Sequence, residues 1–218
     1  MSSERGALWD LDGVIVDSGP FHFRAWRRIA GLLGRDLAPE EFRASFGLRN
    51  EDILRRFFGI SDPERASELA RRKEEFFREE IRGKIQPQPG AMELLCLFED
   101  LGFAQALVSS TPRENIDLIL SALEIRNFFS AIISGEDVRR GKPDPEGYLL
   151  AARKLGIAPE NCVVIEDAVA GVQAARAAGM KCIAVATTYP PEALKDADLV
   201  VQTLKEVNSK ILKDLFGR

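Results

Sequence analysis

The chain has 218 residues, 45% hydrophobic and 29% charged, with a formal net charge of −4. This length and composition suit one sizeable core with room for a smaller insertion. There is no apolar run long enough to cross a membrane and no basic stripe of the kind that binds nucleic acid. The three cysteines lie among apolar neighbours without metal-ligand spacing, so we expect reduced thiols in a cytoplasmic protein.

The first part of the chain changes from a strand pattern to helical patterns. Residues 7–9 are apolar and predict the end of a buried strand. Apolar residues at helical spacing follow Ser18, and we expect further helices at 40–46, from a cap at Asn50 to 58, and from 63 to about 81. Residues 83–90, rich in Gly, Pro and Gln, predict a hinge. We therefore expect residues 18–83 to form a helical domain inserted into a core of residues 1–17 and 84–218.

The remainder alternates between strands and helices. Strands are predicted at 104–108, 131–134, 162–165, 181–186 and 199–201, and helices at 91–101, 115–123, 146–155, 171–178 and from about 204. Such alternation predicts an α/β fold with a parallel sheet covered on both faces. Ligands of these folds bind beyond the carboxyl ends of the strands.

Two carboxylates, Asp10 and Asp12, directly follow the first predicted strand, and Gly13 comes next. If strand geometry persists to Asp12, both side chains project to the same side and repel each other. A divalent cation could compensate, or one carboxyl group could have a raised pKa. Both conditions can hold in one site, with Asp10 as nucleophile and metal ligand and Asp12 as proton donor and then base. A turn rich in Asp and Gly is the simpler interpretation.

Two polar stretches occupy corresponding positions later in the chain. Ser109, Ser110 and Thr111 lie between a strand and a helix, where hydroxyl and N–H groups can hold phosphate oxygens. Lys142 lies in a Gly-Lys-Pro turn and could neutralise both Asp10 and a transferring phosphoryl group. Taken singly, these stretches are more commonly a helix-capping serine cluster and an exposed loop lysine.

A further acidic pair, Glu166 and Asp167, ends the apolar stretch 163–165. Adjacent acids at such a place are costly unless a cation pairs with them, which favours a metal-binding role. Together these parts permit phosphoryl transfer through an aspartate. Asp10 attacks phosphorus, Mg²⁺ and Lys142 offset the phosphoryl charge, and the inserted helices exclude bulk water.

With all four elements in order, the chain resembles the haloacid dehalogenase (HAD) superfamily. The elements are Asp10-Leu11-Asp12-Gly13-Val14, then Ser109, then Lys142, then Glu166-Asp167. The resemblance implies a Rossmann-like core with an inserted α-helical cap, a Mg²⁺ cofactor and a phosphorylated small-molecule substrate. It also implies that Asp10, Glu166, Asp167 and the backbone carbonyl of Asp12 hold the metal.

Within the superfamily, the chain is most similar to the β-phosphoglucomutase-like branch, which implies substrate contacts from the cap. His22 and Lys73 match cap positions of that branch. In the loop beginning at Gly47, Arg49 stands where the branch has a serine, and Asn50 stands where it has an arginine that grips a second phosphate. An asparagine cannot replace the charge of a guanidinium group. The expected substrate-binding residues are His22, Gly47, Arg49, Asn50, Lys73, Ser110 and Thr111.

The altered distal grip favours a Mg²⁺-dependent phosphatase acting on sugar phosphates or similar metabolites. The first alternative is a β-phosphoglucomutase, which interconverts β-glucose 1-phosphate and glucose 6-phosphate. The second is a catalytically silent binding protein, against which the intact Asp10, Asp12, Lys142 and Asp167 argue. We expect a monomer with no nucleic-acid or membrane partner.

Overall fold

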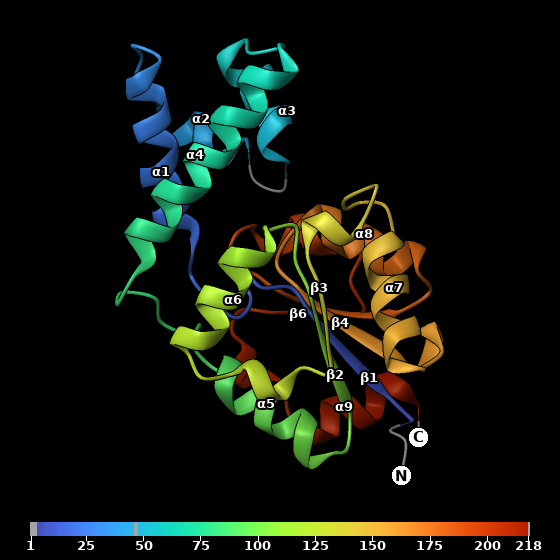
Figure 1. Ribbon diagram of the computed structural model, residues 1–218. Coiled ribbons are helices and arrows are strands. Elements are labelled where there is room, and N and C mark those ends of the chain that lie inside the picture. Colours follow the sequence, from blue (N-terminus) through green and yellow to red (C-terminus); the bar gives the residue numbers. More distant parts are fainter. Residues whose placement is uncertain (1–3, 46–47, 218) are drawn as a thin grey trace. The chain divides into compact units, whose positions relative to one another are not determined.

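The computed structural model describes residues 4–45 and 48–217 (Figure 1). The chain divides into two compact units, one formed by Met1–Asp17 with Gln86–Arg218 and the other by Ser18–Ile85. No helix in the described ranges is long and apolar enough to span a membrane.

A parallel sheet organises the first unit, which we call the core unit. Within the described residues, its six strands lie in the order β3-β2-β1-β4-β5-β6. Central β1 pairs with β2 on one side and β4 on the other, and Trp9 is in register with Leu107 and Ile165. The strands are β1 (Gly6–Trp9), β2 (Ala104–Val108), β3 (Ala131–Ile133), β4 (Cys162–Glu166), β5 (Lys181–Val185) and β6 (Leu199–Val201). The predicted α/β fold with a parallel sheet is confirmed.

Helices cover both faces of this sheet because its strands are apolar on both faces. On one face, Leu8 and Val164 pack in one buried cluster with residues of α7 (Glu146–Leu155) and α8 (Val169–Ala177). On the other face, the Trp9 ring packs edge-on against Phe98 of α5 (Ala91–Asp100), with ring centroids 5.6 Å apart. Figure 1 shows α7 and α8 on one side of the sheet and α5 and α9 (Ser209–Phe216) on the other.

The helix boundaries in the core unit differ most from the predicted ones at two inner helices and at the C-terminal end. Helix α6 (Arg113–Ala122) and helix α8 each begin two residues early. The expected terminal helix is instead a short 3₁₀ turn, η5 (Leu204–Glu206), followed by α9. Asn208 separates the two because its Oδ1 accepts hydrogen bonds from the N–H groups of Lys210 and Ile211 at 3.0 and 3.1 Å.

The chain leaves and re-enters the core unit at two neighbouring segments. Val16 and Pro87 form an antiparallel bridge, and the N–H of Gln88 donates to the carbonyl of Ile15 at 2.7 Å. The two ends of the inserted helical segment are therefore joined by core residues.

The second unit, which we call the helical unit, contains α1 (Gly19–Leu32), α2 (Pro39–Arg43), α3 (Asn50–Phe58) and α4 (Pro63–Ile81). Its buried cluster includes Trp26, Ile29, Leu54 and Leu69. The predicted cap at Asn50 is wrong, because Arg49 is the N-cap of α3 and Asn50 is its first helical residue. The Asn50 side chain instead donates to Glu74 Oε1 at 2.7 Å.

Candidate active site

Three buried carboxylates converge at the carboxyl edge of the sheet. Asp10 follows β1, Glu166 ends the neighbouring β4, and Asp167 comes next. The backbone N–H of Asp10 donates to Ile165 O at 3.0 Å, which continues the pairing of β1 with β4 and sets Asp10 beside Glu166. One oxygen of each carboxylate lies within 4.8 Å of the others, so the cluster has the dimensions of a metal site.

Lys142 brings a positive charge into this cluster from the loop before α7. Its Nζ lies 2.6 Å from Asp10 Oδ1, 2.6 Å from Glu166 Oε1 and 3.4 Å from the carbonyl of Val108. The charges of Asp10 and Glu166 hold the pKa of Lys142 above its ordinary value despite its burial. The amino group of Lys142 therefore stays protonated, and it links Asp10, the candidate nucleophile, to Glu166.

Glu166 is fixed by donors on both of its oxygens. Oε1 accepts from Lys142 and from the hydroxyl of Tyr148 at 2.8 Å, and Oε2 accepts from the N–H groups of Asp167 and Ala168 at 2.8 and 2.9 Å. Burial raises the pKa of Glu166, but Lys142 and these hydrogen bonds outweigh it, so the pKa lies below its ordinary value. Glu166 therefore stays ionised, and it anchors Lys142.

Two residues that support Glu166 were missed by the sequence analysis. Tyr148 is buried on α7, where an aromatic residue at a helical core position gives no separate signal. Gly171 of α8 leaves room for the carboxylate, because a Cβ atom there would lie 1.7 Å from Glu166 Oε1.

The cluster carries more negative charge than the nearby ammonium balances. Burial raises the pKa of Asp10 to about 7 against the opposing effect of Lys142, and Glu166 and Asp12 raise it further. Burial, then Glu166 and Asp10, also raises the pKa of Asp167 well above its ordinary value. Three buried carboxylates gather near the ammonium group of Lys142. Such a cluster suits a hard divalent cation that prefers oxygen ligands.

We expect the metal-free protein to become less stable as pH rises from about 4 to about 7. The pKa of Asp10 is about 7 in the folded protein against an ordinary 3.8, so the folded state binds this proton more tightly. The stability that Asp10 contributes is complete below the unfolded pKa and is lost as pH rises through the folded pKa. Denaturant unfolding across this pH range measures the slope, and saturating Mg²⁺ should reduce or reverse it. A slope that Mg²⁺ leaves unchanged would contradict the expectation.

The carboxylate of Asp12 lies outside the buried cluster and contacts the polar stretch that follows β2, residues 109–111. Asp12 Oδ2 accepts from the hydroxyl of Thr111 at 2.8 Å, and the N–H of Thr111 donates to Ser109 Oγ at 3.1 Å. Ser110 is exposed between them. The structure thus joins the first two motifs through side chains that follow neighbouring strands.

Gly13 allows the chain to turn tightly against Asp167. Its φ is +82°, a value that glycine adopts without strain. A Cβ atom at this position would lie 2.0 Å from Asp167 Oδ2 and 2.9 Å from Thr188 Oγ1. The glycine therefore leaves the space that the Asp167 carboxylate occupies.

Within the helical unit, three of the expected substrate-binding residues meet at Glu74. Lys73 Nζ lies 2.8 Å from His22 Nδ1 and 2.8 Å from Glu74 Oε1, and Asn50 binds the same Glu74 oxygen. Lys73 and Glu74 are both buried. Arg49 is exposed, and Gly47 lies outside the described residues. The sequence analysis missed Glu74, because an acid within a highly charged helix carries no signal of burial.

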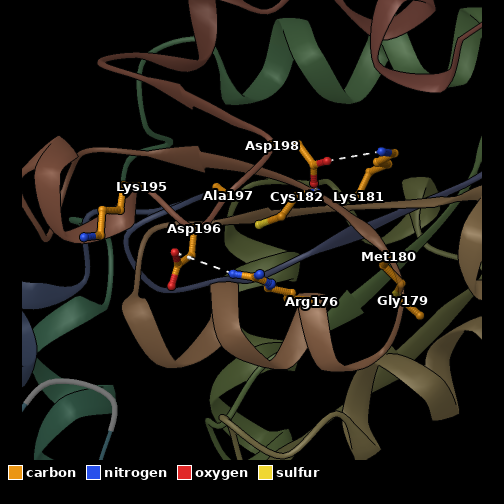
Figure 2. Close-up of a pocket in the computed structure, with 9 residues that line it drawn as sticks. All are labelled: Arg176, Gly179, Met180, Lys181, Cys182, Lys195, Asp196, Ala197 and Asp198. Carbon is orange, nitrogen blue, oxygen red and sulfur yellow. Dashed lines mark hydrogen bonds and ion pairs between the residues drawn. The ribbon is translucent and has the colours of Figure 1, made fainter.

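A pocket of about 410 Å³ lies at the opposite edge of the sheet, where β5 and β6 begin (Figure 2). Arg176 lies 3.6 Å from Asp196 and Lys181 lies 3.2 Å from Asp198, as the dashed lines in Figure 2 show. No predicted site residue lines this pocket. The candidate active site is thus the carboxylate cluster rather than this pocket.

The fold and the site define a parallel α/β protein with an acidic, lysine-containing centre at the carboxyl edge of its sheet. The family model of haloacid dehalogenase-like hydrolases matches residues 4–179, and the chain belongs to this family. It is an HAD phosphohydrolase by this membership, as the sequence motifs indicated.

Individual relatives extend this likeness over nearly the whole chain. Hexitol phosphatase A of Escherichia coli is 39% identical over 207 residues, which cover 93% of each chain. The chloroplastic 5-amino-6-(5-phospho-D-ribitylamino)uracil phosphatase of Arabidopsis thaliana is 35% identical over 96% of this chain, which spans 57% of that longer protein. The solved structure of β-phosphoglucomutase from Clostridium difficile has a TM-score of 0.88 at 27% identity and covers 98% of this chain and 97% of that one.

Proposed function

We propose that this protein is a Mg²⁺-dependent phosphatase that acts on sugar phosphates or similar small phosphorylated metabolites through an aspartyl-phosphate. The contact between Asp10 and Lys142, beside Glu166 and Asp167, carries the proposal. It joins a nucleophile, a fixed positive charge and an acidic centre in one place. The names of the two phosphatases described above support a phosphorylated small molecule as the substrate.

In the proposed reaction, a carboxylate oxygen of Asp10 attacks phosphorus, and the bond from phosphorus to the leaving oxygen breaks. Asp12 donates a proton to that oxygen and releases the alcohol. Asp12 then accepts a proton from water, whose oxygen attacks phosphorus and frees both Asp10 and inorganic phosphate. Lys142 offsets charge on the phosphoryl oxygens, and Thr111 orients Asp12 through its hydrogen bond.

The residues present fit a bound Mg²⁺. We propose that Asp10, Asp167 and the backbone carbonyl of Asp12 hold the ion. The sequence analysis also placed Glu166 among the ligands, but each of its oxygens already accepts two hydrogen bonds, so we propose that it contributes its negative charge instead. When bound, the ion would neutralise charge on the phosphoryl group and on its ligands. Ser109 and Ser110 are proposed to contact phosphate oxygens.

We also propose that residues 1–17 and 84–218 act as the catalytic core and residues 18–83 as a cap that selects the substrate. Within the helical unit, the Lys73 charge is balanced by Glu74, and Asn50 is bound to the same carboxylate. These two residues therefore offer little net charge for gripping a second phosphate, which favours a phosphatase over a mutase. His22 and the exposed Arg49 remain proposed contacts for the rest of the substrate.

A two-product assay tests the proposal. The protein is incubated with Mg²⁺, β-glucose 1-phosphate and a trace of glucose 1,6-bisphosphate, and both phosphate and glucose 6-phosphate are followed. Release of phosphate with little glucose 6-phosphate supports the phosphatase, and a panel of sugar phosphates then ranks the substrates. Glucose 6-phosphate formed much faster than phosphate would instead establish a mutase.

Asp12→Asn should slow turnover by about a hundredfold to ten-thousandfold, because asparagine can neither donate nor accept the transferred proton. Mg²⁺ affinity should change little, since the Asp12 side chain lies outside the buried carboxylate cluster. Steady-state kinetics and calorimetric Mg²⁺ titration measure the two effects separately. Wild-type turnover in this variant would remove Asp12 from the acid–base role.

A further inference from the structure

The loop after β5 binds two elements of the candidate site. The Thr187 hydroxyl donates to the carbonyl of Gly13 at 2.6 Å. The hydroxyl of the next residue, Thr188, lies beside the carboxylate of Asp167, where it favours the charged form and so lowers the pKa of that carboxyl. Thr187 is exposed and Thr188 half-buried, and neither was identified from the sequence.

Asp167 and Glu166 are held in different ways. Glu166 accepts four hydrogen bonds, one of them from the N–H of Asp167 itself. For the carboxylate of Asp167, burial disfavours the charged form, and the nearby Thr188 hydroxyl favours it. The Thr188 hydroxyl is therefore an uncharged neighbour of this carboxylate that favours its ionised form.

The packing around Gly13 places these groups close together. A Cβ atom on Gly13 would lie 2.0 Å from an Asp167 oxygen and 2.9 Å from the Thr188 hydroxyl oxygen. The turn after Asp12, the carboxylate of Asp167 and the hydroxyl of Thr188 therefore share one small volume.

We propose that Thr188 is a positioning residue of the metal site, which holds the Asp167 carboxylate in the orientation that binds the ion. Thr187 attaches the turn after Asp12 to the same loop, so one segment sets both elements. A hydroxyl suits this role because it occupies one lone pair of the carboxylate and adds no charge that would repel a cation. Hydrogen-bonding partners of metal ligands commonly act in this way. The inference rests on the proposed Mg²⁺ site.

Thr188→Val tests the role, because valine keeps the branched shape and removes the hydroxyl. Mg²⁺ affinity, measured by calorimetric titration without substrate, should fall by about 10- to 100-fold. Thr188→Ser, which keeps the hydroxyl, should restore most of the affinity. If valine prevents folding, Thr188→Ala serves as the variant without a hydroxyl.

Asp167→Asn separates failure of this inference from failure of the proposed metal site. Weak Mg²⁺ binding by both Asp167→Asn and Thr188→Val, with recovery in Thr188→Ser, supports the positioning role. If Asp167→Asn binds poorly and Thr188→Val binds as tightly as wild type, the role of Thr188 is overturned while the metal site stands. Equal weakness of the serine and valine variants also overturns it. Wild-type affinity in Asp167→Asn would remove the metal site itself.

Discussion

Asp10→Asn should lower the rate of phosphate release by about 10⁴-fold or more, because an amide does not replace the attacking carboxylate. The variant should remain folded. Asp10 shares the ammonium of Lys142 with Glu166 and lies near Asp167, so removing its charge relieves repulsion in the metal-free cluster. Phosphate release and thermal unfolding of the metal-free protein measure the two effects.

Labelling with beryllium fluoride provides the control for this prediction, because the reagent mimics a phosphoryl group on a carboxylate. Wild-type protein with Mg²⁺ should bind it at Asp10, and Asp10→Asn should not. An aspartyl-phosphate detected in the variant would show that another residue is the nucleophile. Failure of the wild-type protein to bind the reagent would revive the hypothesis of a catalytically silent binding protein.

Lys142→Met should lower the free energy of unfolding by about 3–5 kcal/mol near neutral pH, because Asp10 and Glu166 lose their buried partner. The loss should be smaller near pH 5, where protonation of Asp10 relieves part of the repulsion. Turnover should fall by about 10²- to 10³-fold, since the charge on the phosphoryl oxygens is less well offset. Denaturant unfolding at the two pH values and steady-state kinetics measure these effects.

Lys181→Met is the matched control. Lys181 lies 3.2 Å from Asp198 in a pair that is 43% and 35% exposed, so its loss should change the free energy of unfolding by less than about 1 kcal/mol. Turnover should be unchanged because Lys181 lies at the opposite edge of the sheet. Equal destabilisation by the two substitutions would show that Lys142 has no special role in balancing the buried charge.

The sequence was most informative where reactive side chains directly follow predicted strands. The short apolar runs predicted the sheet because each is bounded by helix or turn signals, and parallel strands place their carboxyl ends at one edge. Asp10 and Glu166 follow neighbouring strands, so local patterns were enough to predict that the site lies at this edge.

The sequence was less informative where a role depends on a partner that is distant in the chain. Tyr148 resembles any apolar residue of a helix until its hydroxyl is seen 2.8 Å from Glu166. Asparagine is a common helix-capping residue, but the side chain of Asn50 donates a hydrogen bond to Glu74, which is 24 residues away. Thr188 belongs to an ordinary loop, and its contact with Asp167 depends on β5 lying beside β4. None of these pairings produces a local periodicity.

The junction at Val16 and Pro87 has a consequence for how such a protein can change. The core fastens both ends of the inserted segment to each other, through this bridge and the hydrogen bond from Gln88 to Ile15. In polymer terms, the inserted segment is a loop whose two ends are held together by contacts within the core unit. The entropic cost of closing a flexible loop grows only slowly with the length of the loop. The segment between these two points can therefore be lengthened, shortened or replaced with little effect on the register of β1 and β2. The helical unit can thus vary in sequence and length independently of the carboxylate cluster in the core unit.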